Sequence, residues 1–229
     1  MIREKIVKKT VYLSIFVQII TTLISLLGIN YDLEPRDNIL KHILLIEAGV
    51  QFIEAIFYVW VIYALKNLKI MASRRYVDWF ITTPLMLFTT VIYMQYIKDK
   101  QEGNHEIITI PTFIQENKQL LFQIFLCNFG MLLFGILHEL NYLSMDTAIP
   151  LGFVFFGMSF YLIYDNFAKH TEEGTKLFTF LISCWALYGL AATRNDITKN
   201  TMYNCLDVVS KNFYGLFIFY QITQIGHKP

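Results

Sequence analysis

Two charged residues lie inside an otherwise apolar stretch towards the C-terminal end of the chain. Asp207 and Lys211 interrupt the run MYNCLDVVSKNFYGLFIFYQI. A single such charge at mid-membrane depth costs roughly 2.5–3.5 kcal/mol on insertion scales, so something must offset or remove it. The two residues are four positions apart and therefore share one face of a helix. They form either a structural ion pair or a functional site, and ionisable residues inside membranes usually mark the latter.

The chemistry open to Lys211 is covalent attachment of a carbonyl compound. A lysine amine in a dry pocket can form a Schiff base, which needs counterions when it is protonated. Asp207, one turn away, and Asp78, in the segment RRYVDWFITTPLMLFTT, could supply the negative charge. Arg75, Asp78 and Thr82 are spaced i, i+3, i+7 along one helix face. We expect the Thr82 hydroxyl to hydrogen-bond the Asp78 carboxylate, and Arg75 to hold water and balance the acids.

A second group of polar residues lies in the segment LIEAGVQFIEAIFYVW. Glu47, Gln51 and Glu54 are spaced i, i+4, i+7, so they lie on one helix face about 10 Å long. A row of carboxylates suits a cation path, because the oxygens replace hydration and repel anions. The alternative is a pair of protonated glutamates hydrogen-bonded between helices. If this helix starts near Asn38 on the cytoplasmic side, Glu54 lies at mid-membrane and Glu47 nearer the cytoplasm.

The composition indicates that membrane helices position these residues. Of the 229 residues, 55% are hydrophobic and 16% charged, which is typical of a membrane protein. The 19 Lys and Arg nearly balance the 18 Asp and Glu, so nucleic acid is not an expected partner. Cys127, Cys184 and Cys205 all fall within apolar runs, and we expect buried thiols rather than a disulfide framework. The sequence predicts no catalytic residue and no metal site.

Seven runs are apolar and long enough, or nearly so, to cross a bilayer, which takes about 20 residues. They cover residues 11–27, 43–65, 76–97, 120–137, 149–164, 177–192 and 202–225, and the fifth and sixth should extend over 148–166 and 175–193. We expect the intervening polar segments to be loops, and EIITIPTFI in the longest of them to be a short interfacial strand or helix. The sequence thus predicts an all-α membrane protein, a single seven-transmembrane-helix domain spanning residues 1–229.

The first run is interpreted as a membrane helix rather than a signal peptide. It follows the basic segment MIREKIVKKT, but it is long for a signal peptide and no A-x-A cleavage site comes after it. Lys and Arg are spread over loops on both sides, so the positive-inside rule does not set the orientation.

Two of these segments resemble motifs of the microbial (type 1) rhodopsins, seven-helix proteins that carry retinal on a lysine of the last helix. RYVDWFITTPLML is similar to their third-helix motif and LDVVSK to their seventh. WALYG resembles the family's W-x-x-Y-P, with Gly189 in place of proline, while NFGMLLFG and FVFFGMSF fit the fourth and fifth helices. The short chain is most similar to the rhodopsins of giant viruses, and its second helix resembles that of channelrhodopsins.

The resemblance implies a role for each site residue. Lys211 would hold all-trans retinal as a protonated Schiff base, Asp78 would be the primary counterion and proton acceptor, and Asp207 the second counterion. Arg75 would organise the extracellular half, and the family's topology places the N-terminus outside, in a host cell membrane. The other residues expected at the retinal are Trp79, Thr82, Thr83, Met86, Met131, Gly135, Phe156 (where the family often has Trp), Ser159, Trp185 and Tyr188. Without the lysine motif, these aromatics would be interpreted as core packing.

The resemblance leaves the response to light open. In pumps, a carboxylate seven positions after Thr82 returns a proton from the cytoplasm; here that position is Thr89, which cannot donate one at physiological pH. The acidic release pair is missing as well, because the position eight before Asp207 is Lys199. An efficient outward proton pump is therefore less expected than a slow one. The retained Asp78 disfavours a chloride pump, and the absence of N-D-Q in the third helix disfavours a sodium pump.

We therefore predict a light-gated cation channel for H⁺, Na⁺ or K⁺. Deprotonation towards Asp78 would let water enter between helices one, two, three and seven, with Glu47 and Glu54 as gate and filter and Ser14 and Asn204 on the same path. The alternatives are a light-driven outward proton pump or weak proton transporter, and a photosensor with a separate transducer. No enzyme activity is expected. Besides the lipid bilayer and the cations, a homo-oligomer is an expected partner, and no residue selects its stoichiometry.

Overall fold

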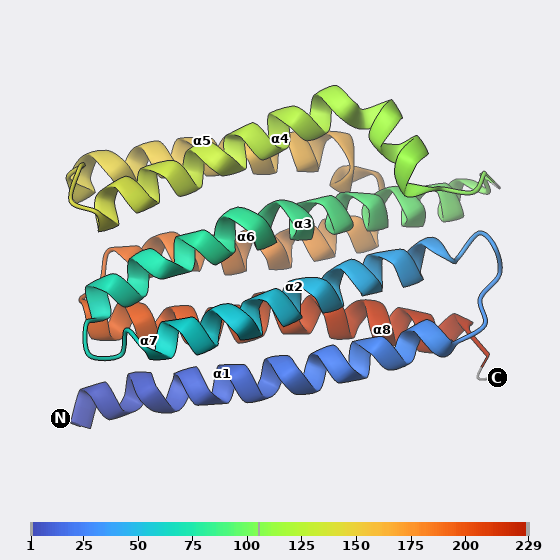
Figure 1. Ribbon diagram of the computed structural model, residues 1–229. Helices are drawn as coiled ribbons and strands as arrows, with labels where there is room; N and C mark the ends of the chain where they lie inside the picture. The colour runs from blue at the N-terminus through green and yellow to red at the C-terminus, as the bar shows by residue number, and fades with distance from the viewer. Residues whose placement is uncertain (1, 105, 228–229) are drawn as a thin grey trace.

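The computed structural model describes residues 2–104 and 106–227, with side chains from residue 5 onward, and these form a bundle of seven helical crossings (Figure 1). The first six are α1 Ile2–Leu27, α2 Ile39–Ile62, α3 Leu68–Glu102, α4 Ile110–Glu139, α5 Met145–Asn166 and α6 Glu172–Ala192. The last consists of α7 Asp196–Asp207, a π-helical turn η3 Val208–Asn212 and α8 Phe213–Ile225, and two 3₁₀ turns, η1 Gly28–Asn30 and η2 Ala168–His170, lie in connections. The predicted all-α, seven-helix architecture is confirmed.

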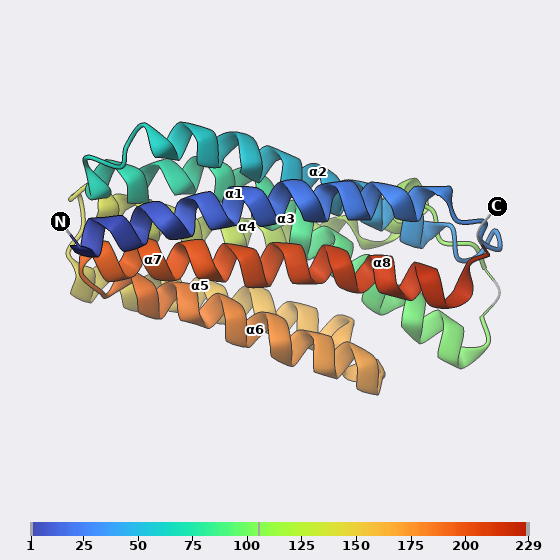
Figure 2. The ribbon, with the colours of Figure 1, turned by 90° about the horizontal axis from the view of Figure 1, so that it is seen from below.

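The crossings lie side by side with their long axes roughly parallel. α1 lies against α2 and the last crossing, while α4 and α5 pair on the opposite side of the bundle (Figures 1 and 2). α3 is the central element: 72% of its most apolar stretch is buried, compared with 28% for α1. The two ends of the chain lie at opposite ends of the bundle, as an odd number of crossings requires (Figure 1).

Six helices are long and apolar enough to cross a membrane by length and composition. The seventh crossing is divided because η3 separates α7 from α8. The outward sides of the helices carry exposed large apolar side chains, such as Phe16, Phe52 and Phe122, which is the surface that lipid requires. Cys127 and Cys184 are buried as expected, but the expectation for Cys205 is wrong, because it is exposed on α7.

Several helices begin earlier than hydropathy indicates, because polar caps start them. Asn67 accepts a hydrogen bond from the Ile70 amide at 3.3 Å, so most of the expected loop KNLKIMASR belongs to α3. Asn195 caps α7 in the same way, so this helix begins at Asp196, six residues before the predicted run. EIITIPTFI is neither a separate strand nor a separate helix, since Thr109 caps α4 within it. α2 begins at Ile39, next to Asn38 as predicted.

Candidate functional site

The side chain of Lys211 enters the centre of the bundle from the π-helical turn η3. π-helical turns are rare interruptions of α-helices that occur frequently at functional sites. The lysine is only 2% exposed, although its Nζ carries a charge. Such a group is stable in a membrane interior only beside partners of opposite charge.

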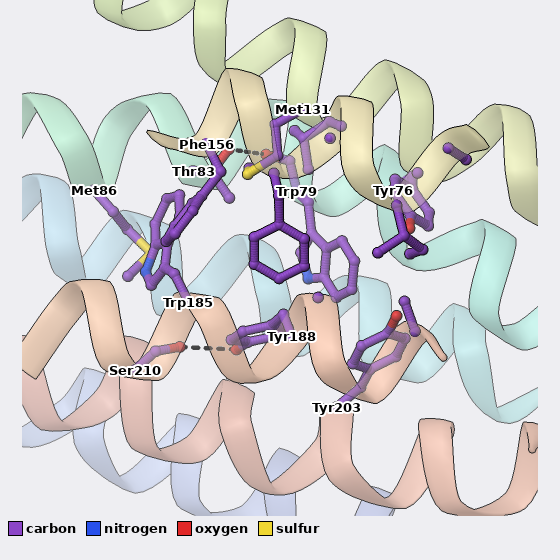
Figure 3. A pocket seen from close by; sticks show the side chains of 18 of the residues that line it. Tyr76, Trp79, Thr83, Met86, Met131, Phe156, Trp185, Tyr188, Tyr203 and Ser210 are labelled. Atoms are coloured by element: carbon purple, nitrogen blue, oxygen red, sulfur yellow. Dashed lines mark hydrogen bonds between the residues drawn. The ribbon is translucent and has the colours of Figure 1, made fainter. Parts of the chain in front are cut away.

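A largely apolar cavity opens beside Lys211 and runs between α3, α4, α5, α6 and the last crossing. Figure 3 shows Met86 and Trp185 towards one end of this cavity and Tyr76 and Tyr203 towards the other. Eight of the residues expected at the retinal line it: Trp79, Thr83, Met86, Met131, Gly135, Phe156, Trp185 and Tyr188. Besides Lys211, the sequence analysis placed none of the other lining residues at the retinal; they are Tyr76, Leu132, Ala148, Ile149, Gly152, Phe153, Gly189, Ala192, Tyr203 and Ser210.

Two residues expected at the retinal do not line this cavity. The Thr82 hydroxyl donates to the main-chain oxygen of Asp78 at 3.1 Å, not to its carboxylate, because a helical threonine readily bonds the carbonyl one turn back. The Ser159 hydroxyl donates to the main-chain oxygen of Ile124 at 3.2 Å and so joins α5 to α4. The expected hydrogen bond from Thr82 to the Asp78 carboxylate is therefore wrong, whereas the places of Thr82 and Ser159 at the retinal stay predictions.

Three carboxylates surround the amine of Lys211. Its Nζ donates to Asp78 Oδ2 at 2.7 Å and lies 2.9 Å from Glu54 Oε1, without hydrogen-bond alignment in the second contact. The distance to Asp207 Oδ1 is 4.0 Å. The sequence analysis placed Glu54 on an ion path, not at the amine. Spacing within one helix could not show that contact, because it joins α2 to the last crossing.

Asp207 is held by three other donors. Its Oδ2 accepts hydrogen bonds from the Tyr58 hydroxyl at 2.6 Å and from Arg75 Nη1 at 2.9 Å, and its Oδ1 accepts one from the Tyr188 hydroxyl at 2.8 Å. Arg75 also donates to Asn204, on the same crossing as Asp207. Tyr58 was not predicted, although it follows Glu54 by four residues and therefore lies on the same face of α2.

Polar residues of α1 continue along the last crossing. Ser14 donates to the main-chain oxygen of Asn204 at 2.9 Å. Gln18, Thr21 and Ser25 follow it at intervals of four, three and four residues, and all are buried. This spacing places the four residues on one face of α1, so the row of polar side chains could have been recognised in the sequence. The sequence analysis named only Ser14.

Several polar atoms in this region lack a hydrogen-bond partner within the described part of the chain. These are the side-chain amides of Gln18 and Gln51, the Ser25 hydroxyl and Asn212 Nδ2. Gln18, Gln51 and Ser25 are fully buried. A Cβ at Gly215 would lie 2.2 Å from Gln51 Nε2, so the glycine makes room for this amide, whereas Ser25 Oγ would lie at an ordinary contact distance of 3.6 Å. We name Gln18, Ser25, Gln51 and Asn212 the polar seam between α1, α2 and the last crossing.

Glu47 and Thr89 join α2 to α3 further along the bundle. The Thr89 hydroxyl donates to Glu47 Oε1, and Glu47 is fully buried. The second carboxylate oxygen of Glu47 has no partner within the described residues. The position that lacks the expected carboxylate of a pump therefore has one beside it, on the neighbouring helix.

A buried ion pair lies where the end of α4 meets the start of the last crossing. Lys199 Nζ contacts both carboxylate oxygens of Glu139 at 2.8 Å, and these side chains are 6% and 4% exposed. Lys199 was identified as a departure from the pump pattern, but Glu139 was missed, because no local pattern joins two residues sixty positions apart.

Comparison with known proteins places the chain in a family. The family model of bacteriorhodopsin-like proteins matches residues 9–225. The viral rhodopsin OLPVRII is 26% identical, with a TM-score of 0.83 over 96% of this chain and 98% of that one. The rhodopsin of Exiguobacterium sibiricum is 18% identical, with a TM-score of 0.76 over 98% of both chains, and shows the fold alone. No curated protein sequence was found to match.

Members of this family are integral membrane proteins that bind retinal covalently through a Schiff base to a lysine. The chain therefore belongs to the bacteriorhodopsin-like family and is a retinal-binding microbial rhodopsin similar to the viral rhodopsins.

Proposed function

We propose that this protein is a light-gated cation channel with retinal attached to Lys211. The observation that carries the proposal is the polar seam, in which fully buried Gln18, Gln51 and Ser25 have polar atoms without a hydrogen-bond partner among the described residues. Buried polar groups are almost always satisfied, and those without a protein partner are usually bonded to internal water. A hydrated line of polar side chains between helices is what a cation needs to cross.

The residues around Lys211 fit retinal, an elongated apolar molecule with one reactive aldehyde. Trp79, Trp185 and Met131 offer flat or polarisable apolar surfaces, and the polar groups gather at the amine. Gly135 belongs to a closely fitted wall, because a Cβ there would lie 2.5 Å from the Tyr76 hydroxyl. Retinal, when bound, supplies the absorption of light. The protein positions it, excludes water and accepts or returns protons.

Asp78, Asp207 and Glu54 have different roles in this proposal. Asp78, nearest to the Lys211 nitrogen, serves as primary counterion and proton acceptor. Asp207, bonded to Arg75, fixes the arginine across one half of the bundle. In the resting protein, Lys211 also holds Glu54 in an ion contact. When the nitrogen gives its proton to Asp78, Glu54 loses this cation and becomes free to attract another.

Glu54 then acts as the gate and Glu47 as a filter further along the path. Gln51 lies between them, and Ser14 and Asn204 extend the path along α1 and the last crossing. H⁺, Na⁺ and K⁺ are the proposed cations, because carboxylates attract cations and repel anions.

We further propose that residues 1–229 act as one retinal-binding domain with no enzyme activity. The N-terminus is placed outside a host cell membrane, by resemblance to the family, and the C-terminus on the cytoplasmic side. The position of the two ends at opposite faces of the bundle agrees with this arrangement (Figure 1). The proposed assembly is a homo-oligomer.

One observation favours a second function, light-driven proton transport. Glu47 bonds to Thr89, so a carboxyl group is available close to the place where family pumps keep their cytoplasmic proton donor. After transfer to Asp78, outward transport would need release of that proton to the outside, return of a proton from Glu47 to the Lys211 nitrogen, and reprotonation of Glu47 from the cytoplasm. Glu47 would thus be either the filter of a cation channel or the proton donor of a pump.

Patch-clamp recording of cells that express the protein with retinal separates these functions. A light-induced current that reverses with the cation gradient supports the channel. A one-directional current without a reversal potential supports the pump, and no current from well-expressed, coloured protein supports a photosensor with a transducer. Lys211→Ala must abolish the colour; a pigment that persists in this variant contradicts the proposed attachment.

A further inference from the structure

We infer that Glu54 is the second counterion of the Lys211 nitrogen and an alternative acceptor of its proton. The resemblance assigns the role of second counterion to Asp207, but the distances from Lys211 Nζ to the carboxylate oxygens favour Glu54. Glu54 Oε1 lies 2.9 Å from Nζ, and Asp207 Oδ1 lies at 4.0 Å. Glu54 is fully buried on α2, so no bulk water separates it from the amine.

Asp207 is already engaged by other groups. Its Oδ2 accepts from Arg75 and Tyr58, and its Oδ1 accepts from Tyr188. An Arg–carboxylate contact with additional hydrogen bonds is the arrangement that stabilises a buried ion pair. Asp207 therefore neutralises Arg75, and its charge acts on Lys211 only at longer range.

Glu54 has the opposite surroundings. Neither of its carboxylate oxygens has a hydrogen-bond partner in the described part of the chain, and its one close ionic contact there is Lys211. With Asp207 assigned to Arg75, one cation at Lys211 faces two carboxylates, those of Asp78 and Glu54. Both carboxylates are therefore placed to accept the proton of the Lys211 nitrogen.

The attachment of retinal increases the competition between the two acids. The protonated amine of a free lysine has three hydrogens to donate, whereas the nitrogen of a protonated Schiff base, which is double-bonded to carbon, has only one. Only one carboxylate at a time can accept that hydrogen. When the N–H bond breaks, its electron pair stays on nitrogen and the proton forms an O–H bond on either Asp78 or Glu54. The two destinations lie on different helices, α3 and α2.

The destination matters for the proposed function. Transfer to Asp78 leaves Glu54 charged beside the polar seam, while transfer to Glu54 makes that carboxyl neutral. The inference rests on the proposed attachment of retinal at Lys211, but it does not depend on whether the protein conducts cations.

The test measures loss of the proton from the nitrogen, which shifts the absorption of the pigment to the blue after a flash. Purified pigments of the unsubstituted protein, D78N, D78N/E54Q and D78N/E173Q are compared. D78N should keep a substantial blue-shifted product, because Glu54 still accepts. D78N/E54Q should reduce it at least about tenfold, as expected for removal of a positioned acceptor. D78N/E173Q is the control, since Glu173 is a partly buried acid that accepts a hydrogen bond from Tyr93 and has no place at Lys211 or on the proposed path, and it should behave like D78N.

Two results would overturn the inference: no blue-shifted product in D78N, or an undiminished product in D78N/E54Q. If D78N/E54Q fails to form pigment, the conservative variant D78N/E54D is compared with D78N instead. Light-induced infrared difference spectra should then show a carboxyl C=O band that moves between the two, and an unmoved band overturns the inference. Failure of the unsubstituted chain to form pigment, or colour in Lys211→Ala, would instead contradict the proposed attachment.

Discussion

The hydroxyl of Thr89 donates a hydrogen bond to the carboxylate of Glu47, which links the middle of α3 to α2 at a fully buried point. In the pump pattern the carboxylate is on the third helix, at the position of Thr89. Here α3 carries a hydroxyl at that position and the neighbouring α2 carries the acid. A single substitution can therefore remove the acid without touching the counterions at Lys211.

Glu47→Gln is predicted to lower the light-induced cation current several-fold or to change its reversal potential, because it removes a charge from the path. The absorption maximum should not move, since Glu47 bonds to Thr89 and makes no ion contact with Lys211. Current and absorption are measured on the same expressed protein. A current with unchanged size and selectivity would remove Glu47 from the path.

Gly215→Ala is predicted to disturb the polar seam. The new Cβ would lie 2.2 Å from Gln51 Nε2, so the amide must move or the helices must separate, at a cost of about 1–3 kcal/mol in the free energy of unfolding. The current should fall as well, because the amide occupies the proposed path. Gly49→Ala is the matched control, since nothing lies within 4 Å of a Cβ there. Thermal loss of pigment colour and patch-clamp recording provide the two measurements; equal behaviour of the two variants contradicts the prediction.

Tyr58→Phe is predicted to destabilise the pigment by about 1.5–3 kcal/mol, the usual loss for a hydrogen bond to a charged group. The hydroxyl donates to Asp207 at 2.6 Å and accepts from Arg75 at 3.0 Å, so its removal weakens both ends of that ion pair. Tyr63→Phe, at an exposed tyrosine of the same region, should have almost no effect. Chemical denaturation followed by the loss of pigment absorption measures the difference. Equal stability of the two variants would show that Tyr58 does not support the pair.

The sequence predicted the seven crossings because membrane helices are specified by long apolar runs, each recognisable by itself. It also named eight of the residues that line the cavity beside Lys211, through motifs carried by single helices. It did not predict that Glu54 contacts Lys211 or that Glu139 pairs with Lys199, since those contacts depend on how distant helices pack. Helix starts at Leu68 and Asp196 were missed for another reason: the Asn caps act outside the apolar run.

Lys199→Met is predicted to be strongly destabilising, by about 3–5 kcal/mol, because it leaves Glu139 as an unpaired buried charge. The double variant Glu139→Leu/Lys199→Met should recover most of this loss, since replacement of both partners by apolar groups of similar size is often neutral. The exposed pair of Lys176 and Glu172 on α6 provides the control, and Lys176→Met should change stability little.

Unfolding of the unsubstituted pigment, Lys199→Met, Glu139→Leu and the double variant in denaturant gives the four values needed for a double-mutant cycle on Glu139 and Lys199. Lys176→Met is measured beside them as the control. A double variant as unstable as Lys199→Met alone would show that the loss comes from packing at Lys199 and not from the stranded carboxylate. If Lys199→Met is as stable as the unsubstituted protein, the two residues do not form an ion pair in the folded pigment. The expected recovery would show that Lys199, at the position of the missing proton-release acid, belongs to a structural ion pair that joins α4 to the last crossing.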